Sequence, residues 1–232
     1  MLRMGLRFWV FALVISLLGS PSHANLIVNG SFENFIIGPN DVNFGGFVRF
    51  FSPPPNTDIA GWTITGSNGG HPNNVDHVNT SHYPAFSGAT ESLDMEDDFN
   101  ARGVISQSFA TAPGDTYNLA FAYANNPDNG PGTVAMMNAL VTGAGVLLSQ
   151  NVSHSGSTAA NMNYLLFSQD FVANSAFTTL QFSALTNSGF GIALDAVSVE
   201  TVVPGVPEPA SAALLAMGLL CLLGIARRRR IA

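Results

Sequence analysis

The chain has 232 residues, enough for one large or two small domains, and it contains fifteen acidic residues, eight arginines and no lysine. Between residues 25 and 203, two arginines stand against fourteen acidic residues, a net charge of −12. This balance excludes the proteins that bind nucleic acid or anionic lipid through basic side chains, whereas it attracts Ca²⁺, which prefers oxygen ligands. The only cysteine, Cys221, lies outside this segment, which therefore has no disulfide.

Residues 1–24 have the composition of a secretory signal peptide. Two arginines precede an apolar stretch over residues 8–18, and Ser22 and Ala24 supply small side chains before the expected cleavage site. We therefore predict cleavage before Asn25. The alternative is an uncleaved N-terminal anchor, but the apolar stretch is shorter than the ~20 residues that a membrane span needs.

Residues 25–203 are predicted to form one all-β exported domain. Short runs rich in Phe, Val, Ile, Thr and Tyr are separated by Gly, Asn, Pro and Asp, which is typical of strands joined by turns. Alternation of large with small or polar side chains favours a jelly roll or β-sandwich with one buried face on each sheet. The expected strands lie near residues 26–28, 44–51, 59–65, 75–78, 91–95, 103–110, 116–124, 135–142, 145–148, 165–172, 177–184 and 192–199.

Two polar stretches raise the question of metal binding. His71, His77 and His82 could hold Zn²⁺ or Cu²⁺, but no cysteine or regular ligand spacing accompanies them, so a polar surface loop is the preferred interpretation. Residues 94–98 are nearly all acidic but lack the spacing and central glycine of a calcium-binding EF-hand loop. They bind a cation or form a solvated loop, and we favour the solvated loop.

A sugar site needs an exposed aromatic ring surrounded by amides and carboxylates, because sugars present C–H faces and hydroxyl rims. Trp62 lies in an apolar run and is expected in the core, whereas Tyr83 is expected at the surface. Residues 125–132 form a turn-rich loop of the kind that often carries binding residues. The predicted ligand-binding residues are Tyr83, Tyr123, Asn125, Asn126 and Asp128.

Nothing in the exported segment indicates an enzyme. It has no Gly-x-Ser-x-Gly turn, phosphate-binding loop or cysteine nucleophile, and no two of its fourteen acids are singled out as a glycosidase pair. We therefore predict that the domain is not catalytic.

The C-terminal end is predicted to cross a membrane. Residues 210–226 are apolar apart from one serine, and four arginines follow at once. As a helix, such a segment reaches about 25 Å, slightly less than the ~30 Å hydrocarbon layer, and the arginines favour the cytoplasmic side. A buried helix of a soluble domain is the alternative, but it would not be apolar all round. Residues 204–209 are a linker and residues 227–232 a basic cytoplasmic tail.

These terminal features together resemble the PEP-CTERM sorting signal. The motif consists of Val206, Pro207, Glu208 and Pro209, then the apolar helix, then Arg227, Arg228, Arg229 and Arg230. The resemblance implies an exosortase-type enzyme as processing partner, in a Gram-negative bacterium that makes exopolysaccharide. The protein would stay briefly in the inner membrane through its C-terminal helix and then reach the cell surface or extracellular matrix.

The exported segment is similar to the choice-of-anchor C family, which is related to a domain of unknown function in plant cell-wall proteins. The matching stretches are residues 25–33 (NLIVNGSFE), 61–64 (GWTI), 103–109 (GVISQSF) and 193–199 (ALDAVSV). The resemblance implies a galactose-binding-like jelly roll, shared with many carbohydrate-binding modules. It also implies a structural Ca²⁺ with Glu33 and Asp195 as ligands, although both carboxylates could instead accept backbone N–H bonds.

The expected function is therefore non-catalytic binding to polysaccharide of the biofilm matrix or cell wall. A structural matrix protein that associates with itself is one alternative, and a surface glycan hydrolase is another.

Overall fold

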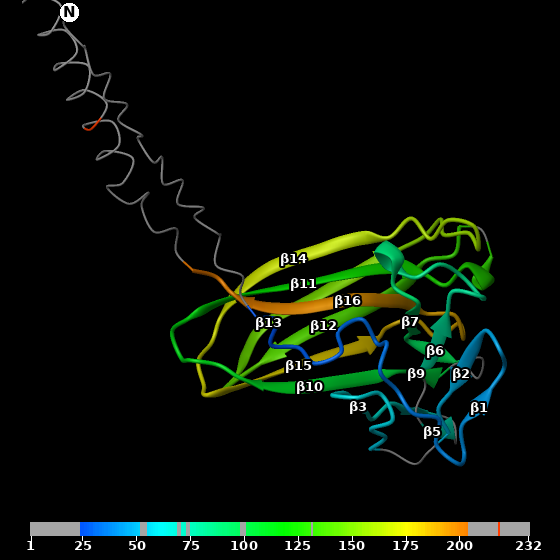
Figure 1. Cartoon of the computed structure of the whole chain (residues 1–232), viewed down its shortest axis with the longest axis horizontal. Coiled ribbons are helices and arrows are strands. Elements are labelled where there is room, and N and C mark those ends of the chain that lie inside the picture. Colours follow the sequence, from blue (N-terminus) through cyan, green and yellow to red (C-terminus); the bar gives the residue numbers. More distant parts are fainter. Residues whose placement is uncertain are drawn as a thin grey trace, which may run out of the picture.

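The alternation of buried and exposed side chains in the sequence becomes a two-sheet antiparallel sandwich in the computed structural model (Figure 1). The structure describes residues 24–51, 55–68, 71–72, 75–97, 101–130, 132–203 and 218. The predicted signal peptide, linker, membrane helix and basic tail fall almost wholly outside these residues. Within the described ranges, no helix is long and apolar enough to cross a membrane.

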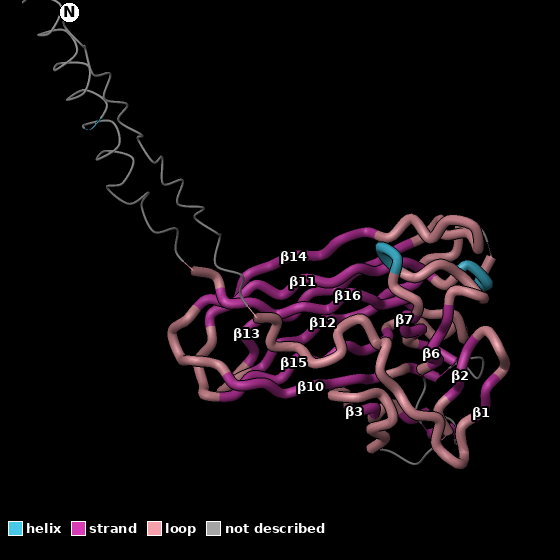
Figure 2. Tube along the Cα trace, in the orientation of Figure 1, coloured by secondary structure: helices cyan, strands magenta, loops and turns pink. Residues whose placement is uncertain are grey.

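The larger sheet has seven strands, and all of its pairings are antiparallel. Its short strands lie together toward one end of the sandwich, where most of the loops gather (Figure 2). In spatial order the strands are β1 (Val42–Asn43), β2 (Phe47–Arg49), β6 (Asp76–Asn79), β7 (Glu91–Asp94), β16 (Ile192–Thr201), β11 (Thr116–Asn125) and β14 (Leu165–Val172).

The smaller sheet has five strands, again antiparallel throughout. In spatial order they are β13 (Val146–His154), β12 (Ala135–Thr142), β15 (Phe177–Ala184), β10 (Val104–Ala110) and β3 (Thr63–Ile64). Two small ribbons and two 3₁₀ turns complete the described elements. They are β4 (Ser67–Asn68) with β5 (His71–Pro72), β8 (Glu96–Asp97) with β9 (Ala101–Arg102), η1 (Phe86–Gly88) and η2 (Pro127–Asn129).

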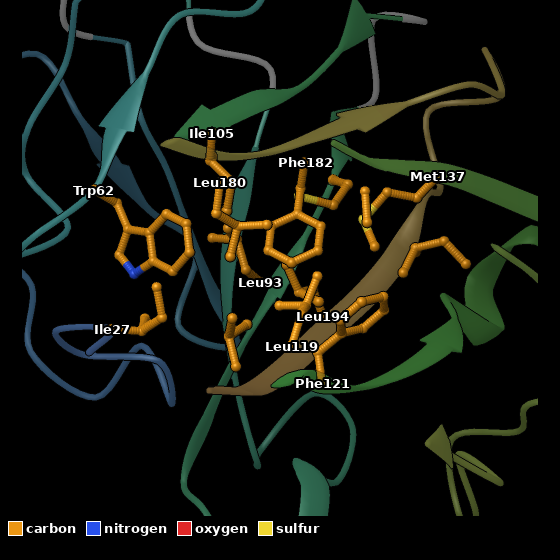
Figure 3. Close-up of a cluster of buried hydrophobic side chains, with 14 of the residues drawn as sticks. Ile27, Trp62, Leu93, Ile105, Leu119, Phe121, Met137, Leu180, Phe182 and Leu194 are labelled. Atoms are coloured by element: carbon orange, nitrogen blue, oxygen red, sulfur yellow. The ribbon is translucent and has the colours of Figure 1, made fainter. Parts of the chain in front are cut away.

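The inner faces of the two sheets bury one large core (Figure 3). Phe121 of β11 meets Phe182 of β15 edge-on across the sandwich, with ring centroids 5.1 Å apart. Trp62 is buried as predicted, and its indole N–H donates to the backbone oxygen of Asn29 at 3.0 Å. All buried residues of this core lie between Ile27 and Val199, so the exported segment contains its own hydrophobic core.

A second, smaller cluster lies on the opposite face of the seven-stranded sheet, which we call the outer face. Ala124 and Ala193 face each other on neighbouring strands and pack there with Val78. Met162 and Tyr83 cover them from loops. Loops therefore cover part of the outer face, and the candidate site lies beneath them.

Three expected strands are shorter than predicted or missing. Residues 26–28 form a turn rather than a strand, because the Asn25 side chain accepts the backbone N–H of Ile27, and Asn29 adopts a left-handed φ of 53°. The run at 44–51 shortens to β2, since Gly45 (φ 90°) turns the chain back onto β1. The run at 59–65 shortens to β3.

Candidate functional site

The centre of the candidate site is a row of charged residues on the outer face of the seven-stranded sheet. Arg49 of β2 lies opposite Asp76 of β6, which in turn lies opposite Asp94 of β7. Successive side chains of a strand point to opposite faces. The neighbours His77 and Leu93 therefore point inward, while the charged row points outward.

Arg49 and Asp76 form a bidentate ion pair. The Arg49 Nε and Nη2 atoms donate to the two carboxylate oxygens of Asp76 at 2.9 and 2.8 Å, and the side chains are only 3% and 8% exposed. Because planar guanidinium matches carboxylate geometry, this pair fixes both side chains in place. Removing either partner would leave a buried charge uncompensated.

Asp94 is held by donors from three directions. Its carboxylate accepts from the Asn126 side-chain amide at 2.6 Å, from Gly191 N at 2.8 Å and from Glu96 N at 3.2 Å. Burial raises the pKa of Asp94 well above its usual value, although the hydrogen bond from Asn126 favours the carboxylate form. Asp94 thus ties the loop after β11 and the loop before β16 to the sheet.

Two loops meet above this row. The His82 Nε2 atom lies 2.8 Å from the Asp128 carboxylate, and the two side chains are 31% and 44% exposed. Asp128 is positioned by η2, where its N–H donates to the Asn126 side chain at 2.9 Å. We call this contact the His82–Asp128 bridge.

Between the bridge and the sheet is a hollow of about 30 Å³, which we call the acidic hollow. Asp76, Asp94 and Asp128 line it, and the rings of Phe47 and Phe190 lie beside them. A cavity of roughly 10–15 Å³ already holds a water molecule. The hollow therefore has room for at least one water or sugar hydroxyl group.

Of the five predicted ligand-binding residues, only Asn126 and Asp128 line the acidic hollow. The prediction that Tyr83 is a surface residue was wrong: it is 1% exposed, packs in the outer-face cluster and cannot form a platform for sugar. Burial raises the pKa of its hydroxyl, which also lies in the negative field of Asp94. Within the described ranges, this hydroxyl has no hydrogen-bond partner.

The other two residues of the prediction have structural contacts. Asn125 is 1% exposed, and its side-chain oxygen accepts from Ser157 N at 3.0 Å. Tyr123 is half-buried against the main core, with its ring edge-on to His154 at 6.2 Å between centroids. Both residues connect β11 to the end of β13 and the loop that follows it.

The acidic run is not the solvated loop that we favoured. Asp94 and Glu96 are 2% and 0% exposed. The Glu96 carboxylate accepts from the Ser188 and Gly189 N–H groups at 2.8 and 3.2 Å and from the Thr186 hydroxyl. Hydrogen-bond donors offset the cost of burying these carboxylates: an amide and backbone N–H groups for Asp94, and backbone N–H groups and a hydroxyl for Glu96. Asp98 lies outside the described residues.

The histidines do not form a metal centre in the described part of the chain, where no group of three metal-ligating side chains comes together. The surface-loop interpretation was wrong for His77, which is 1% exposed and packs against the tilted ring of Phe35 at 3.8 Å between ring centroids. His82 forms the bridge over the acidic hollow. The side chain of His71 is not among those described.

Glu33 and Asp195, the predicted calcium ligands, both accept backbone N–H bonds. Glu33 accepts from Thr90 and Glu91 at 2.7 and 3.0 Å, and Asp195 accepts from Phe86 at 2.8 Å. Burial disfavours the Glu33 carboxylate, but the bonds from Thr90 and Glu91 outweigh it and lower its pKa. Burial raises the pKa of Asp195 to about 7, and the nearby Glu33 charge adds to this rise.

A calcium ion takes six to eight oxygen ligands, and the described side chains do not by themselves fit such a shell. Their contacts match the N–H-accepting role that the sequence left open. Calcium binding by Glu33 and Asp195 stays a prediction.

Sequence reasoning did not connect Asp76, His82 or the two phenylalanines of the acidic hollow with a sugar site. The period of two in β2 and β6 could have placed Phe47 with Arg49 and Asp76 with Val78 on common faces. It could not have shown that β7 lies beside β16, because that pairing joins residues far apart in the chain.

Two family models match the sequence. The family described as protein of unknown function (DUF642) matches residues 25–200, and the PEP-CTERM protein-sorting motif matches residues 205–230. Both agree with the relationships predicted from the sequence motifs. A search of curated protein sequences returned no match.

Solved structures share the sandwich. TmCBM61, determined in complex with β-1,4-galactotriose, is 14% identical with a TM-score of 0.50 over 77% of this chain and 99% of that chain. A structure described as CBM4 is 14% identical with a TM-score of 0.42 over 76% and 99%. A family 35 carbohydrate-binding module from Clostridium thermocellum is 14% identical with a TM-score of 0.42 over 60% and 90%.

At this level of identity the likeness establishes only the fold, an antiparallel β-sandwich, and the predicted all-β sandwich is confirmed. The sorting motif indicates export and sorting to the surface of a Gram-negative bacterium. The chain belongs to the DUF642 family and ends in a PEP-CTERM sorting motif.

Proposed function

We propose that the protein is a non-catalytic polysaccharide-binding protein of the biofilm matrix or cell wall, delivered by an exosortase-type enzyme after a brief stay in the inner membrane. The acidic hollow is the proposed contact point for sugar. It carries the proposal because it combines carboxylates, an imidazole and an amide with two half-buried aromatic rings.

The chemistry of the acidic hollow suits a neutral sugar. Carboxylate and amide groups can bind pairs of neighbouring hydroxyls, and ring faces can pack against sugar C–H groups. The volume of about 30 Å³ accommodates a sugar hydroxyl or hydroxymethyl group. Anionic polysaccharides would be repelled by the net charge of −12 on residues 25–203.

The contacts of the three acids favour binding over hydrolysis. A glycosidase needs one carboxyl group that donates a proton and a second that acts as base or nucleophile. Asp76 is engaged with Arg49, Asp94 with Asn126 and two backbone N–H groups, and Asp128 with His82. Each is already committed to a contact that supports the fold or the bridge.

A glycan array with residues 25–203 tests this proposal, with Asp128→Asn as the diagnostic variant. This change keeps the side-chain shape but removes the charge that faces His82, so we expect binding to neutral glycans to weaken at least tenfold. Asp115→Asn, an exposed change in the loop between β10 and β11, is the matched control and should bind like the wild type. Equal binding by both variants would reject the acidic hollow as the site.

A reducing-sugar assay on the glycans that the protein binds distinguishes binding from hydrolysis. We expect no release of reducing sugar from any glycan that the protein binds. Release that disappears in a variant of one hollow carboxylate would establish a hydrolase instead.

A further inference from the structure

The sandwich has one protected rim and one open rim. On one side, the sheets end in β1 and β3, which have two residues each. On the other side they end in β14 and β13, with eight and nine residues, and these two strands contact each other (Figure 1). Very short edge strands hinder edge-to-edge pairing between molecules, whereas a long edge presents a row of backbone donors and acceptors to a partner.

The long β14 edge has few of the usual protections against pairing. It contains no lysine, proline or bulge, and within the described ranges no strand pairs with its outer side. Its only charged residue is Asp170, whose carboxylate accepts from the Asn118 side chain at 2.6 Å. β13 has no acidic residue, lysine or arginine. The two strands of this rim therefore carry one acidic residue in a segment with a net charge of −12, which limits the repulsion between two copies that approach there.

Apolar side chains are unusually exposed along β14. Leu166 is 70% exposed, Val172 is 54% exposed and Leu165 is 48% exposed. Single exposed apolar residues are common on proteins, but three on one unpaired edge strand indicate a surface that a partner covers.

We propose that two copies of this chain associate by antiparallel pairing of their β14 strands about a twofold axis that passes through Gln169. The pairing would join the two seven-stranded sheets into one continuous sheet. A contact through the same strand of both copies is self-complementary and closes after two molecules.

Because side chains alternate between the two faces of a strand, only some registers of the β14–β14 pair are possible. Directly opposite residues in an antiparallel pair point to the same face, so the axis must pass through a residue rather than between two. With Gln169 on the axis, Leu166 meets Val172 of the second copy on the outer face, and Phe167 meets Phe171 on the core face. Ser168 then meets Asp170, while the two Asp170 side chains do not face each other.

The pairing has a consequence for ligand binding that rests on the proposed function. A twofold axis perpendicular to the sheet leaves both outer faces, with their acidic hollows, on the same side of the dimer. Two linked sites that face the same way can bind one polysaccharide with greater avidity than either site alone.

Disulfide trapping in the full chain tests the pairing directly. With Cys221→Ala as background, Gln169→Cys places one thiol on the proposed axis. Opposite Cα atoms in antiparallel pairs are about 4.5–5.5 Å apart, within the range for a disulfide. We expect oxidised glutathione to convert most of this variant to a covalent dimer, which a reducing gel would dissociate. Ser108→Cys, an exposed residue on the internal strand β10, should remain monomeric.

Charge substitutions test the register. Leu166→Glu added to Gln169→Cys should abolish cross-linking, and Phe177→Glu, at 69% exposure on the internal strand β15, should not. A mixture of Leu166→Glu and Val172→Lys chains, each also carrying Gln169→Cys, should cross-link again, because the introduced carboxylate of one chain would face the introduced ammonium group of the other. Thermal melting of each variant confirms that it is folded.

The proposal fails if folded Gln169→Cys cross-links no more than Ser108→Cys, or if Leu166→Glu leaves the yield unchanged. Failure of the mixed chains to restore cross-linking would overturn the register through Gln169. None of these results depends on glycan binding, so this proposal and the proposed function can fail separately.

Discussion

At the scale of single residues, the side chains of His77 and Glu91 define each other's protonation state. The His77 Nε2 atom lies 2.8 Å from the Phe32 carbonyl oxygen, which can only accept a hydrogen bond. In the neutral ring, Nε2 therefore carries the hydrogen, and Nδ1 has a lone pair that can accept one. Burial lowers the pKa of His77 and raises the pKa of Glu91 to about 7, with the Glu33 charge adding to the latter. The Glu91 Oε2 atom lies 3.3 Å from Nδ1 and has no donor. A protonated Glu91 therefore fits this contact, and a carboxylate does not.

This pair predicts how stability depends on pH. The folded-state pKa of Glu91, about 7, exceeds its ordinary value of 4.5, so the free energy of unfolding falls as pH rises from 4.5 to 7. Glu91→Gln cannot ionise and should match the wild type at pH 4.5 but melt at a higher temperature at pH 8. Thermal melts across this range test it, with the exposed Glu200→Gln as control. Parallel curves for wild type and Glu91→Gln would contradict the neutral pair.

The backbone conformation of Ala196 leads to a second prediction for a single residue, which concerns stability. It has a left-handed φ of 51° at a β-bulge, where the pairing of β16 with β11 shifts by one residue. Glycine adopts this conformation without strain, so we expect Ala196→Gly to stabilise the protein by up to about 1 kcal/mol. Ala193→Gly, in the fully buried extended part of β16, should instead destabilise it by about 1 kcal/mol. Chemical denaturation measures both changes, and equal losses would refute the bulge argument.

At the scale of elements, one buried carboxylate organises the loop between β15 and β16. Glu96 receives donors from Thr186, Ser188 and Gly189, and Phe190 of this loop lines the acidic hollow. Glu96→Ala would leave two backbone N–H groups and a hydroxyl without their acceptor, which should cost about 3 kcal/mol of unfolding free energy. It should also make the loop sensitive to protease while wild type resists. Glu200→Ala, exposed on β16, should change neither measurement.

The long strands were predictable and the acidic hollow was not, for a common physical reason. The runs that became β10, β12 and β15 alternate buried with more exposed residues over their whole length, and β11 and β16 do so over part of theirs, because each has one face in the core. The acidic hollow depends on the pairing of Arg49, Asp76 and Asp94 across three short strands. Such pairing is decided by the whole sandwich, so local pattern could not indicate that Asp94 is buried or that His82 meets Asp128.

Tyr83 shows why burial could not be predicted from local sequence, because a residue expected at the surface is buried. Its surroundings in sequence are polar and turn-rich, which is typical of a surface residue. The loop that carries it folds back over the small residues Ala124 and Ala193 of the outer face, and this space accommodates its ring. A sequence pattern describes the neighbours along the chain, whereas burial here depends on neighbours across the sheet.

At the scale of the whole molecule, the net charge of −12 on residues 25–203 makes any divalent cation stabilising in a non-specific way. A calcium site at Glu33 and Asp195 must therefore be separated from general screening. If the site exists, Ca²⁺ should raise the melting temperature more than equal Mg²⁺, and Asp195→Asn should remove the difference. Asp170→Asn, an equal change in net charge away from these residues, should preserve it. Identical responses to both cations in the wild type would reject the site.

The sorting motif makes a prediction for the whole chain in its cell. Residues 205–230 match the PEP-CTERM motif, in which a charged Glu208 between two prolines precedes the apolar segment. If an exosortase-type enzyme recognises the triplet, Glu208→Ala should leave unprocessed chains in the inner-membrane fraction and deplete the surface fraction. Pro204→Ala lies outside the matched residues and should sort normally. Fractionation followed by immunoblotting distinguishes the two pools by size. An unchanged surface pool for Glu208→Ala would mean that the triplet does not direct sorting, whatever the sandwich binds.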